Sequence, residues 1–256
     1  MKWEPDDFIL EKSSVWSFPE RGNWATHDSK YRGNCSPYVV RNLLLRYSKE
    51  GDWILDQFAG GGTSLVEAKL LGRNAIGADI NPKAVDRCKE KIAFKYGDAK
   101  IEVREADARK LNFVKDASVD FICTHPPYVD IIKYSDGIEG DFSLLDYTSF
   151  LNAMEQVAEE TFRILKKGNY FAFIIGDIRQ NGSVRPLGFD TMKIFEKAGF
   201  KLKEIIIKQQ HNCKMTDKWE KISIDKNFFL LAHEYVFILK KIERYTKDKW
   251  KSNLVF

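Results

Sequence analysis

The sequence predicts an α/β domain built on a doubly wound, mostly parallel sheet of seven strands. Strand-like apolar runs alternate with helix-like segments from residue 53 onward, and no internal repeat interrupts them. This alternation is typical of a parallel sheet that carries helices on its faces. Hydrophobic residues make up 44% of the 256 residues and charged residues 30%, which indicates a globular chain rather than a disordered or fibrous one.

Seven apolar runs of the β type predict the strands. They lie at 53–58, 74–79, 100–106, 119–124, 169–176, 200–208 and 234–241. Helices are predicted between them, at 36–48, 63–71, 82–96, 146–166 and 186–198. Ser36-Pro37 and Asn81-Pro82 support two of these helix starts, because each places a proline at the first helical position after a capping residue.

The chain is expected to divide into three regions. An N-terminal arm at 1–35 is rich in aromatic residues and turn formers, the main domain covers 36–241, and a basic tail follows at 242–256. Two segments, at 128–145 and 209–232, do not fit the alternation. Long irregular segments in compact domains are usually functional or disordered. We expect short substrate-recognition loops at these two places, since no separate recognition domain fits.

Charge is uneven along the chain. Residues 201–256 hold 13 Lys and Arg against 7 Asp and Glu. Such a basic region can meet the phosphates of a nucleic acid, and a solvated lysine-rich surface is the alternative explanation.

Several classes of protein are not expected. The longest apolar runs, such as 170–176, fall short of the roughly 18 residues that a spanning helix needs, so no membrane segment is predicted. The acids and proline near the N-terminus do not resemble a secretory signal, and a cytoplasmic protein is expected. The four cysteines form no C-x-x-C pair and are expected to be reduced thiols, with no metal site.

The segment LDQFAGGGTSLVEA at 55–68 predicts a ligand-binding turn between a strand and a helix. Glycines let a ligand approach the backbone N–H groups closely, although a tight connection without a ligand is the alternative. Asp79 ends the next strand, where an acid can accept hydrogen bonds from ribose hydroxyls. The glycine spacing departs from the dinucleotide and P-loop patterns, which favours a nucleoside-like ligand without phosphates.

The fourth predicted strand ends in CTHPPYVD at 123–130. This is the carboxyl edge of the sheet, where open α/β folds bind their ligands. Two consecutive prolines remove two N–H donors and leave carbonyl oxygens to accept, which suits an amino group. The aromatic residue that follows offers a face on which a flipped base can stack.

In this order, FAGGGT, GADINP and an acid after the third strand resemble the class I methyltransferases that bind S-adenosylmethionine. The resemblance covers about residues 25–241 and implies a Rossmann-like sheet whose last strand is antiparallel. It implies that the glycine loop contacts the methionine moiety, that Asp79 holds the ribose and that Asp107 approaches the adenine. A helix cap or a surface acid is the alternative for Asp107. The segment at 27–44 resembles the segment that, in amino-methyltransferases with this motif order, completes the cofactor pocket on the methionine side. A purely structural role is the alternative. The cofactor-binding residues expected from this resemblance are Tyr31, Pro37, Asp56, Phe58, Gly60, Gly62, Thr63, Asp79, Ile80, Asp107 and Ala108.

HPPY at 125–128 resembles the [D/N/S]-P-P-[Y/F/W] motif of the DNA amino-methyltransferases, which act on adenine N6 or cytosine N4. The resemblance implies that the catalytic residues are His125, Pro126, Pro127 and Tyr128. It implies that His125 and the Pro126 carbonyl accept the two amino hydrogens, and that Tyr128 stacks on the base. Histidine departs from the family pattern, but a neutral imidazole can accept one hydrogen bond if its ring is suitably oriented.

DNA with a flipped target base is the expected partner, and a companion restriction endonuclease is a candidate second partner. T-x-P-P-Y, with threonine first, resembles the cytosine-N4 versions of the motif, and this resemblance favours cytosine N4 over adenine N6. An RNA base amino-methyltransferase is an alternative, and a catalytically silent nucleic-acid-binding subunit is another. The residues expected to contact the nucleic acid, with a solvated loop or surface turn as the alternative, are Arg179, Lys208, His211, Lys214, Lys218 and Trp219.

Overall fold

The computed structural model describes residues 2–212 and 216–242. Lys214 and the predicted tail beyond residue 242 lie outside the described residues. The helices are α1 (Pro37–Tyr47), α2 (Thr63–Leu70), α3 (Pro82–Ile92), α4 (Tyr147–Ile164), α5 (Leu187–Lys197) and α6 (Thr216–Asp225), with short 3-10 turns η1 (Val129–Ile131) and η2 (Phe142–Leu144). None of the described helices is long and apolar enough to cross a membrane.

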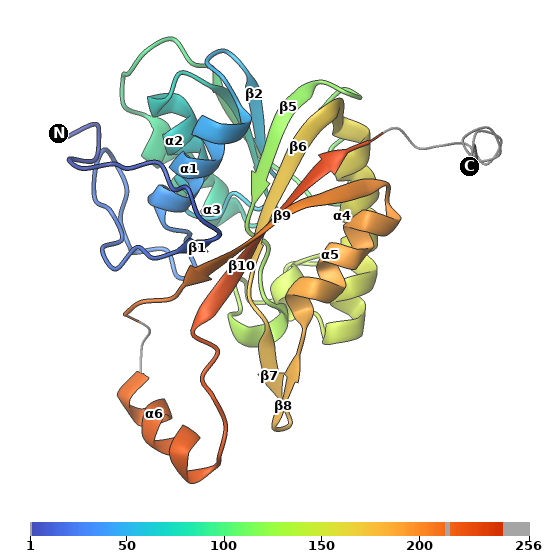
Figure 1. Ribbon diagram of the computed structural model, residues 1–256. Coiled ribbons are helices and arrows are strands. Elements are labelled where there is room, and N and C mark those ends of the chain that lie inside the picture. Colours follow the sequence, from blue (N-terminus) through green and yellow to red (C-terminus); the bar gives the residue numbers. More distant parts are fainter. Residues whose placement is uncertain (1, 213–215, 243–256) are drawn as a thin grey trace, which may run out of the picture.

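An eight-stranded sheet forms the centre of the molecule (Figure 1). Its strands are β1 (Val15–Trp16), β2 (Trp53–Asp56), β3 (Asn74–Asp79), β4 (Ile101–Glu105), β5 (Val119–Thr124), β6 (Leu165–Ile175), β9 (Phe200–Gln209) and β10 (His233–Lys241). They follow the order β1-β9-β10-β6-β5-β2-β3-β4. A separate hairpin pairs β7 (Ile178–Gln180) with β8 (Ser183–Arg185).

The topology confirms the predicted fold class. The pairs that join β6, β5, β2, β3 and β4 are parallel, and β10 is antiparallel to both β6 and β9. All seven predicted strands are present, and the two residues of β1 add an eighth along the edge of β9. The chain order reverses between β2 and β5. Open α/β sheets bind their ligands at the carboxyl ends of the strands beside such a reversal.

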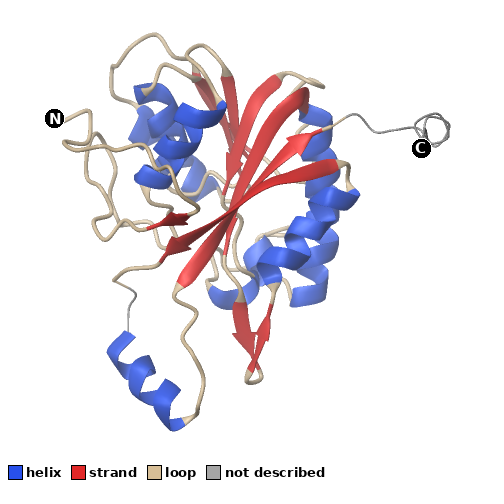
Figure 2. Ribbon diagram, in the orientation of Figure 1, coloured by secondary structure: helices blue, strands red, loops and turns tan. Residues whose placement is uncertain are grey.

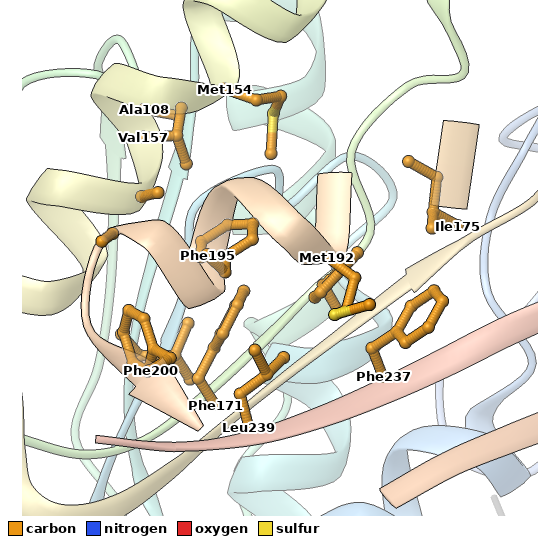
Figure 3. Packing of buried hydrophobic residues seen from close by; sticks show 14 of the residues in the cluster. Ala108, Met154, Val157, Phe171, Ile175, Met192, Phe195, Phe200, Phe237 and Leu239 are labelled. Carbon is orange, nitrogen blue, oxygen red and sulfur yellow. The ribbon is translucent and has the colours of Figure 1, made fainter. Parts of the chain in front are cut away.

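Helices cover both faces of the sheet (Figure 2). On one face, α1, α2 and α3 pack over a cluster that includes Leu43, Ile54 and Phe121. On the other face, α4 and α5 pack over a larger cluster rich in phenylalanine, in which the rings of Phe171 and Phe195 lie 4.5 Å apart (Figure 3). Burial of these apolar side chains is the main force that holds the two helical layers to the sheet.

The structure departs from the predicted boundaries where α4 meets β6. The helix pattern extends to residue 166, but α4 ends at Ile164 and β6 begins at Leu165. Leu165 already pairs with Val119 of β5, and the Lys166 ammonium lies 2.7 Å from the Asp120 carboxylate. Pairing within the sheet therefore overrides the local helical preference.

The segment at 209–232 is not purely a loop, because it contains α6. Its polar composition shows no apolar periodicity, and Lys218, Trp219 and Glu220 of α6 are exposed. The β7–β8 hairpin is a second unpredicted feature. Figure 1 shows that α6 and this hairpin both project from the body of the domain on the same side, beyond the ends of β9 and β6.

A buried carboxylate anchors the N-terminal arm to the domain. Glu67 of α2 has 0% exposure, and its oxygens lie 2.7 Å from Trp24 Nε1, 2.8 Å from His27 Nε2 and 3.1 Å from Arg41 Nη1. Trp24 and His27 belong to the arm, and Arg41 belongs to α1. Because a buried charge is stable only when it is paired, these contacts hold the arm beside the glycine turn that precedes α2.

Replacing this anchor should weaken the whole domain. Glu67→Ala is expected to lower the free energy of unfolding by about 3 kcal/mol, since Trp24 and Arg41 lose a buried partner. Urea denaturation followed by circular dichroism measures the loss. The control is Glu155→Ala in α4, whose half-exposed carboxylate pairs with Lys197 at the surface and should contribute less than about 1 kcal/mol. Equal losses in the two variants would contradict the anchoring role.

Candidate active site

The glycine turn lies at the carboxyl end of β2 and leads directly into α2. Gly62 is the N-cap of this helix and has φ +79°, a left-handed conformation that glycine adopts without strain. An added Cβ at Gly62 would also lie 3.3 Å from Cys88 Sγ of α3. The turn thus needs glycine for its own backbone and for its contact with α3. Gly60 and Gly61 line a pocket beside the chain reversal between β2 and β5.

Asp79 faces this pocket from the end of β3. Its Oδ2 accepts the N–H of Gly60 at 2.8 Å, and its Oδ1 accepts the N–H of Asn81 at 2.9 Å. Burial raises the pKa of the carboxyl, while these two hydrogen bonds oppose the rise. A carboxylate accepts about four hydrogen bonds, so Asp79 keeps capacity for two neighbouring ribose hydroxyls.

Asp107 lies further along the same pocket, beside Ile80 and Phe142. Arg109 engages its carboxylate, with Nε 3.0 Å from both oxygens and the backbone N–H 2.9 Å from Oδ1. Asp107 therefore forms an ion pair with Arg109 and stabilises the local turn. This structural role is close to the capping role that the sequence offered as the alternative. The side chains of Ile80 and Phe142 give this end an apolar character that suits an aromatic ring.

The N-terminal arm lies against the pocket. The ring of Tyr31 stacks on that of Tyr134, with centroids 5.8 Å apart and an interplanar angle of 9°. Asn34 Oδ1 accepts the Thr63 hydroxyl at 2.6 Å, which ties the arm to the first residue of α2. Burial raises the pKa of Tyr134 to about 12, so its hydroxyl stays protonated. The arm, the glycine helix and the 128–145 segment thus meet at one wall.

Most of the expected cofactor-binding residues come together here. Those that line the pocket are Tyr31, Asp56, Phe58, Gly60, Thr63, Asp79, Ile80, Asp107 and Ala108. Pro37 and Gly62 are not among the lining residues; Pro37 begins α1, and Gly62 is the N-cap of α2. Sequence reasoning missed Asn34, Tyr134 and Phe142. The last two come from the 128–145 segment, which was expected to recognise the substrate, and no local motif marks them.

The carboxylate of Asp56 joins the glycine turn to the HPPY turn, which is formed by residues 125–128. It is 6% exposed and accepts the Phe58 N–H at 3.0 Å, the Thr124 hydroxyl at 2.9 Å and the Ser64 hydroxyl. Phe58 opens the glycine turn, Ser64 lies in α2, and Thr124 ends β5 immediately before His125. Burial raises the pKa of Asp56 to about 6, against the effect of these hydrogen bonds.

A chain of hydrogen bonds runs through the HPPY turn. His125 Nε2 lies 2.7 Å from the Tyr128 hydroxyl, which donates to Glu234 Oε1 at 2.8 Å. Glu234 Oε2 accepts the Lys208 ammonium at 2.9 Å. Glu234 of β10 and Lys208 of β9 face each other as direct cross-strand partners. Sequence reasoning missed Glu234, because it lies 106 residues from Tyr128 and belongs to no motif.

The backbone of this turn is held in an uncommon conformation. Val129 has φ +52°, which is strained for a β-branched residue, and its side chain is buried. The Tyr128 ring lies against the backbone of Gly176, where an added Cβ would be 3.1 Å from the ring. Pro126 is buried, and among the described residues none hydrogen-bonds its carbonyl oxygen. His125 and Pro127 line the same pocket as the glycine turn.

The basic residues expected on nucleic acid lie in different environments. Lys208 forms an ion pair with Glu234 beside the HPPY turn, and its side chain is only 15% exposed. Arg179 of β7 donates to the Phe229 carbonyl at 3.0 Å, which connects the hairpin to the segment after α6. These contacts give both residues structural roles within the fold.

The remaining members of that set lie nearer to solvent. His211 is exposed, and its Nε2 lies 3.0 Å from the Ser17 hydroxyl of the arm. Lys218 and Trp219 are exposed on α6, with 48% of Trp219 accessible. Within residues 2–212 and 216–242, no cluster of three or more His, Cys, Asp or Glu side chains could hold a metal ion.

Comparison with known proteins assigns the chain to a family. The family model described as DNA methylase, N6_N4_Mtase, matches residues 6–90 and 119–255. The chain belongs to this DNA methylase family. A general methyltransferase-domain model also matches residues 54–135, from β2 to beyond the HPPY turn.

Curated relatives include both RNA and DNA methyltransferases. A tRNA (guanine(10)-N2)-dimethyltransferase from Methanothermobacter thermautotrophicus is 33% identical over 184 residues, which are 70% of this chain and 53% of that protein. The orphan methyltransferase M.BamHII of Bacillus amyloliquefaciens is 29% identical over 54% of this chain and 46% of that protein. The type II beta methyltransferase M.BslI of a Bacillus species is 31% identical over 56% of this chain and 16% of that protein. The chain thus spans about half or less of the length of these relatives.

Solved structures with low sequence identity share the fold. TrmN from Thermus thermophilus aligns with a TM-score of 0.54 and 20% identity, over 82% of this chain and 50% of that chain. A methyltransferase from Methanosarcina mazei aligns with a TM-score of 0.53 and 16% identity, over 78% of this chain and 98% of that chain. These alignments confirm the Rossmann-like class I methyltransferase fold.

The methyl donor of this family domain is S-adenosylmethionine. The residues of the pocket fit it. Asp79 offers both carboxylate oxygens where a ribose would need acceptors, and Ile80 and Phe142 supply an apolar surface for adenine. Gly60 and Gly61 line the same pocket, where their backbone would contact the methionine moiety.

Removing the charge of Asp79 should weaken binding of the cofactor. Asp79→Asn is expected to raise the dissociation constant of S-adenosylmethionine by about 10- to 100-fold, because a carboxylate accepts stronger hydrogen bonds than an amide. Titration calorimetry measures the constant. The matched control is Asp86→Asn on α3, whose side chain is 76% exposed. An affinity of Asp79→Asn equal to that of the control would show that the ribose is held elsewhere.

Proposed function

We propose that the chain transfers a methyl group from S-adenosylmethionine to the exocyclic amino nitrogen of a flipped DNA base, with cytosine N4 the favoured target. One observation carries the proposal. His125 and Pro127 of the HPPY turn line the same pocket as Asp79 and the glycine turn, so that donor and acceptor sites share one cavity. The match to the DNA methylase family supports the same reaction.

The residues of the HPPY turn then act by positioning the amino group. His125 and the Pro126 carbonyl oxygen each accept one amino hydrogen, which orients the nitrogen lone pair for in-line attack. The Tyr128 ring, held against Gly176, supports the base. When bound, S-adenosylmethionine supplies an electrophilic methyl carbon. Correct orientation of two reactants can supply much of the rate acceleration, so a rigid turn is itself a catalytic device.

Contacts with the polymer come from the projecting elements. We assign α6, with Lys218 and Trp219, and the β7–β8 hairpin to the DNA side of the protein, because both project from the strand ends that carry the pocket (Figure 1). An exposed tryptophan can stack on bases, and lysine can neutralise phosphates. A companion restriction endonuclease is a further candidate partner, since relatives such as M.BslI carry type II methyltransferase names.

An RNA base is the second candidate substrate. The relative with 33% identity over 184 residues is a tRNA (guanine(10)-N2)-dimethyltransferase, which also modifies an exocyclic amino group. The acceptor chemistry of the HPPY turn suits either polymer. The RNA alternative therefore differs from the main proposal in the surface that binds the polymer, not in the reaction.

Nucleoside analysis tests the proposed function. Purified protein is incubated with labelled S-adenosylmethionine and either plasmid DNA or bulk tRNA, and the digested nucleosides are separated by mass spectrometry. We expect label in N4-methylcytosine from DNA. Label in N6-methyladenine alone would overturn the choice of cytosine, and label in tRNA in preference to DNA would overturn the choice of polymer.

The role of His125 predicts a graded response to substitution. His125→Ala should reduce transfer at least about 100-fold, as removal of one positioned hydrogen-bonding group at a reacting centre does in other enzymes, without weakening cofactor binding. His125→Asn should retain more activity than His125→Ala, because its amide carbonyl can accept an amino hydrogen. Single-turnover rates and calorimetry provide the two measurements. Equal rates in the wild type and His125→Ala would show that the amino group is held in another way.

The ionisation of His125 predicts a pH dependence. Burial lowers the pKa of His125 below 6.5, with Lys208 and Arg21 acting in the same direction and Glu234 opposing them. The folded protein therefore keeps the ring neutral as the pH falls through 6.5, where an exposed imidazole would be half protonated. Single-turnover rates should therefore fall less than about twofold between pH 7.5 and 6.0, whereas a pKa of 6.5 would lower them about fourfold over this range. A fall that follows a pKa of 6.5 or higher would contradict this expectation.

A further inference from the structure

We infer that Glu234 is a positioning residue that acts through Tyr128 to set the tautomer of His125, so that Nδ1 is the ring nitrogen that accepts the substrate amino hydrogen. The inference deepens the proposed function and rests on it for the identity of the substrate. The proton positions themselves follow from the hydrogen-bond chain of the protein alone.

Lys208, at one end of the hydrogen-bond chain, sets the direction in which protons are donated along it. Lys208 carries an ammonium, which only donates, and it lies 2.9 Å from Glu234 Oε2. Burial by itself would raise the pKa of Glu234, but Lys208 and the neighbouring His125 and Tyr128 outweigh burial and lower this pKa to about 2. Glu234 is therefore a carboxylate at neutral pH and only accepts hydrogen bonds.

The proton of Tyr128 then points away from His125. A phenol has a single O–H, and Tyr128 donates it to Glu234 Oε1 at 2.8 Å. Burial keeps the pKa of Tyr128 well above its usual value, so the phenol does not ionise. The hydroxyl oxygen can offer His125 only a lone pair. The contact of 2.7 Å between that oxygen and His125 Nε2 therefore requires a proton on Nε2.

A neutral imidazole carries one proton, so Nδ1 is left with a lone pair. Burial lowers the pKa of His125, which favours this neutral form. Among the described residues, none hydrogen-bonds Nδ1, and His125 lines the pocket. Histidine differs here from Asp, Asn or Ser, which can accept a hydrogen bond without any choice of tautomer. A histidine at this position needs a partner that selects the accepting form, and Glu234 supplies it through Tyr128.

Replacing Glu234 with glutamine should exchange the donor and acceptor roles along this series of hydrogen bonds. In Glu234→Gln, Lys208 still only donates, so the amide carbonyl turns to Lys208 and the amide NH₂ faces Tyr128. Tyr128 then accepts from Gln and donates to His125 Nε2, which moves the ring proton to Nδ1. The ring loses its acceptor on the substrate side, although the side chain has almost the same size.

Measurements of the His125 tautomer, of methyl transfer and of cofactor affinity on the purified 256-residue chain test the inference. Long-range ¹H–¹⁵N NMR of protein labelled with ¹⁵N-histidine reports the tautomer without substrate, and the signal of His125 among the four histidines is assigned with His125→Asn. Transfer to DNA and cofactor affinity are measured in parallel. We expect the Nε2–H tautomer in the wild type and the Nδ1–H tautomer in Glu234→Gln, with kcat reduced at least about 10-fold and cofactor affinity unchanged.

Three further variants separate positioning from general stability. Glu204→Gln removes a carboxylate from the neighbouring strand β9, where it pairs with the exposed Lys203, and should leave tautomer and rate unchanged. The double variant Lys208→Met, Glu234→Gln frees the amide to turn its carbonyl to Tyr128, and should restore the Nε2–H tautomer and much of the rate. Tyr128→Phe takes the place of Glu234→Gln if the latter does not fold. It removes only the hydroxyl that fixes the proton on Nε2, so His125 should then show both tautomers.

The outcomes distinguish this inference from the proposed function. An Nε2–H tautomer in Glu234→Gln with the rate unchanged would overturn the inference while the proposed function stands. An Nδ1–H tautomer in the wild type would overturn it directly. A third outcome is that Glu234→Gln changes the tautomer while even the wild type transfers no methyl group to any nucleic acid. This outcome would support the positioning role and overturn the proposed substrate.

Discussion

The arrangement of the site depends on one buried carboxylate, that of Asp56. It ends β2 at the chain reversal, and its hydrogen bonds reach the glycine turn through Phe58, the following helix through Ser64, and the last residue of β5, Thr124. Parallel pairing brings the carboxyl ends of β2 and β5 side by side. Asp56 therefore fixes the distance between the glycine turn and the HPPY turn, which are separated by more than sixty residues in the sequence.

Secondary contacts extend this arrangement in two directions. On the cofactor side, Glu67 fixes the N-terminal arm through Trp24 and His27, and the arm completes one wall of the pocket. On the other side, the antiparallel strand β10 brings Glu234 to the HPPY turn. Each half of the site thus uses a buried carboxylate from a helix or strand to hold residues that lie far away in the chain.

The histidine of the HPPY turn takes the place of the Asp, Asn or Ser of the motif that this turn resembles. An acid or amide at this position presents an acceptor whatever its surroundings, whereas imidazole accepts only through its unprotonated nitrogen. The surroundings of His125 accordingly include an ionised Glu234 and a protonated Tyr128. Under the proposed function, Glu234 from outside the motif acts through Tyr128 and so compensates for the departure from Asp, Asn or Ser.

The sequence by itself determined the α/β class, the seven strands, the glycine turn and the HPPY turn, because apolar periodicity, glycine and proline act over a few neighbouring residues. Only the tertiary structure showed the short strand β1, the end of α4 at Ile164, and the pocket roles of Asn34 and Phe142. It alone revealed Glu234 beside Tyr128, and the pairing of Lys208 with Glu234 rather than with a phosphate. These features depend on contacts between distant segments, for which no local pattern of residues exists.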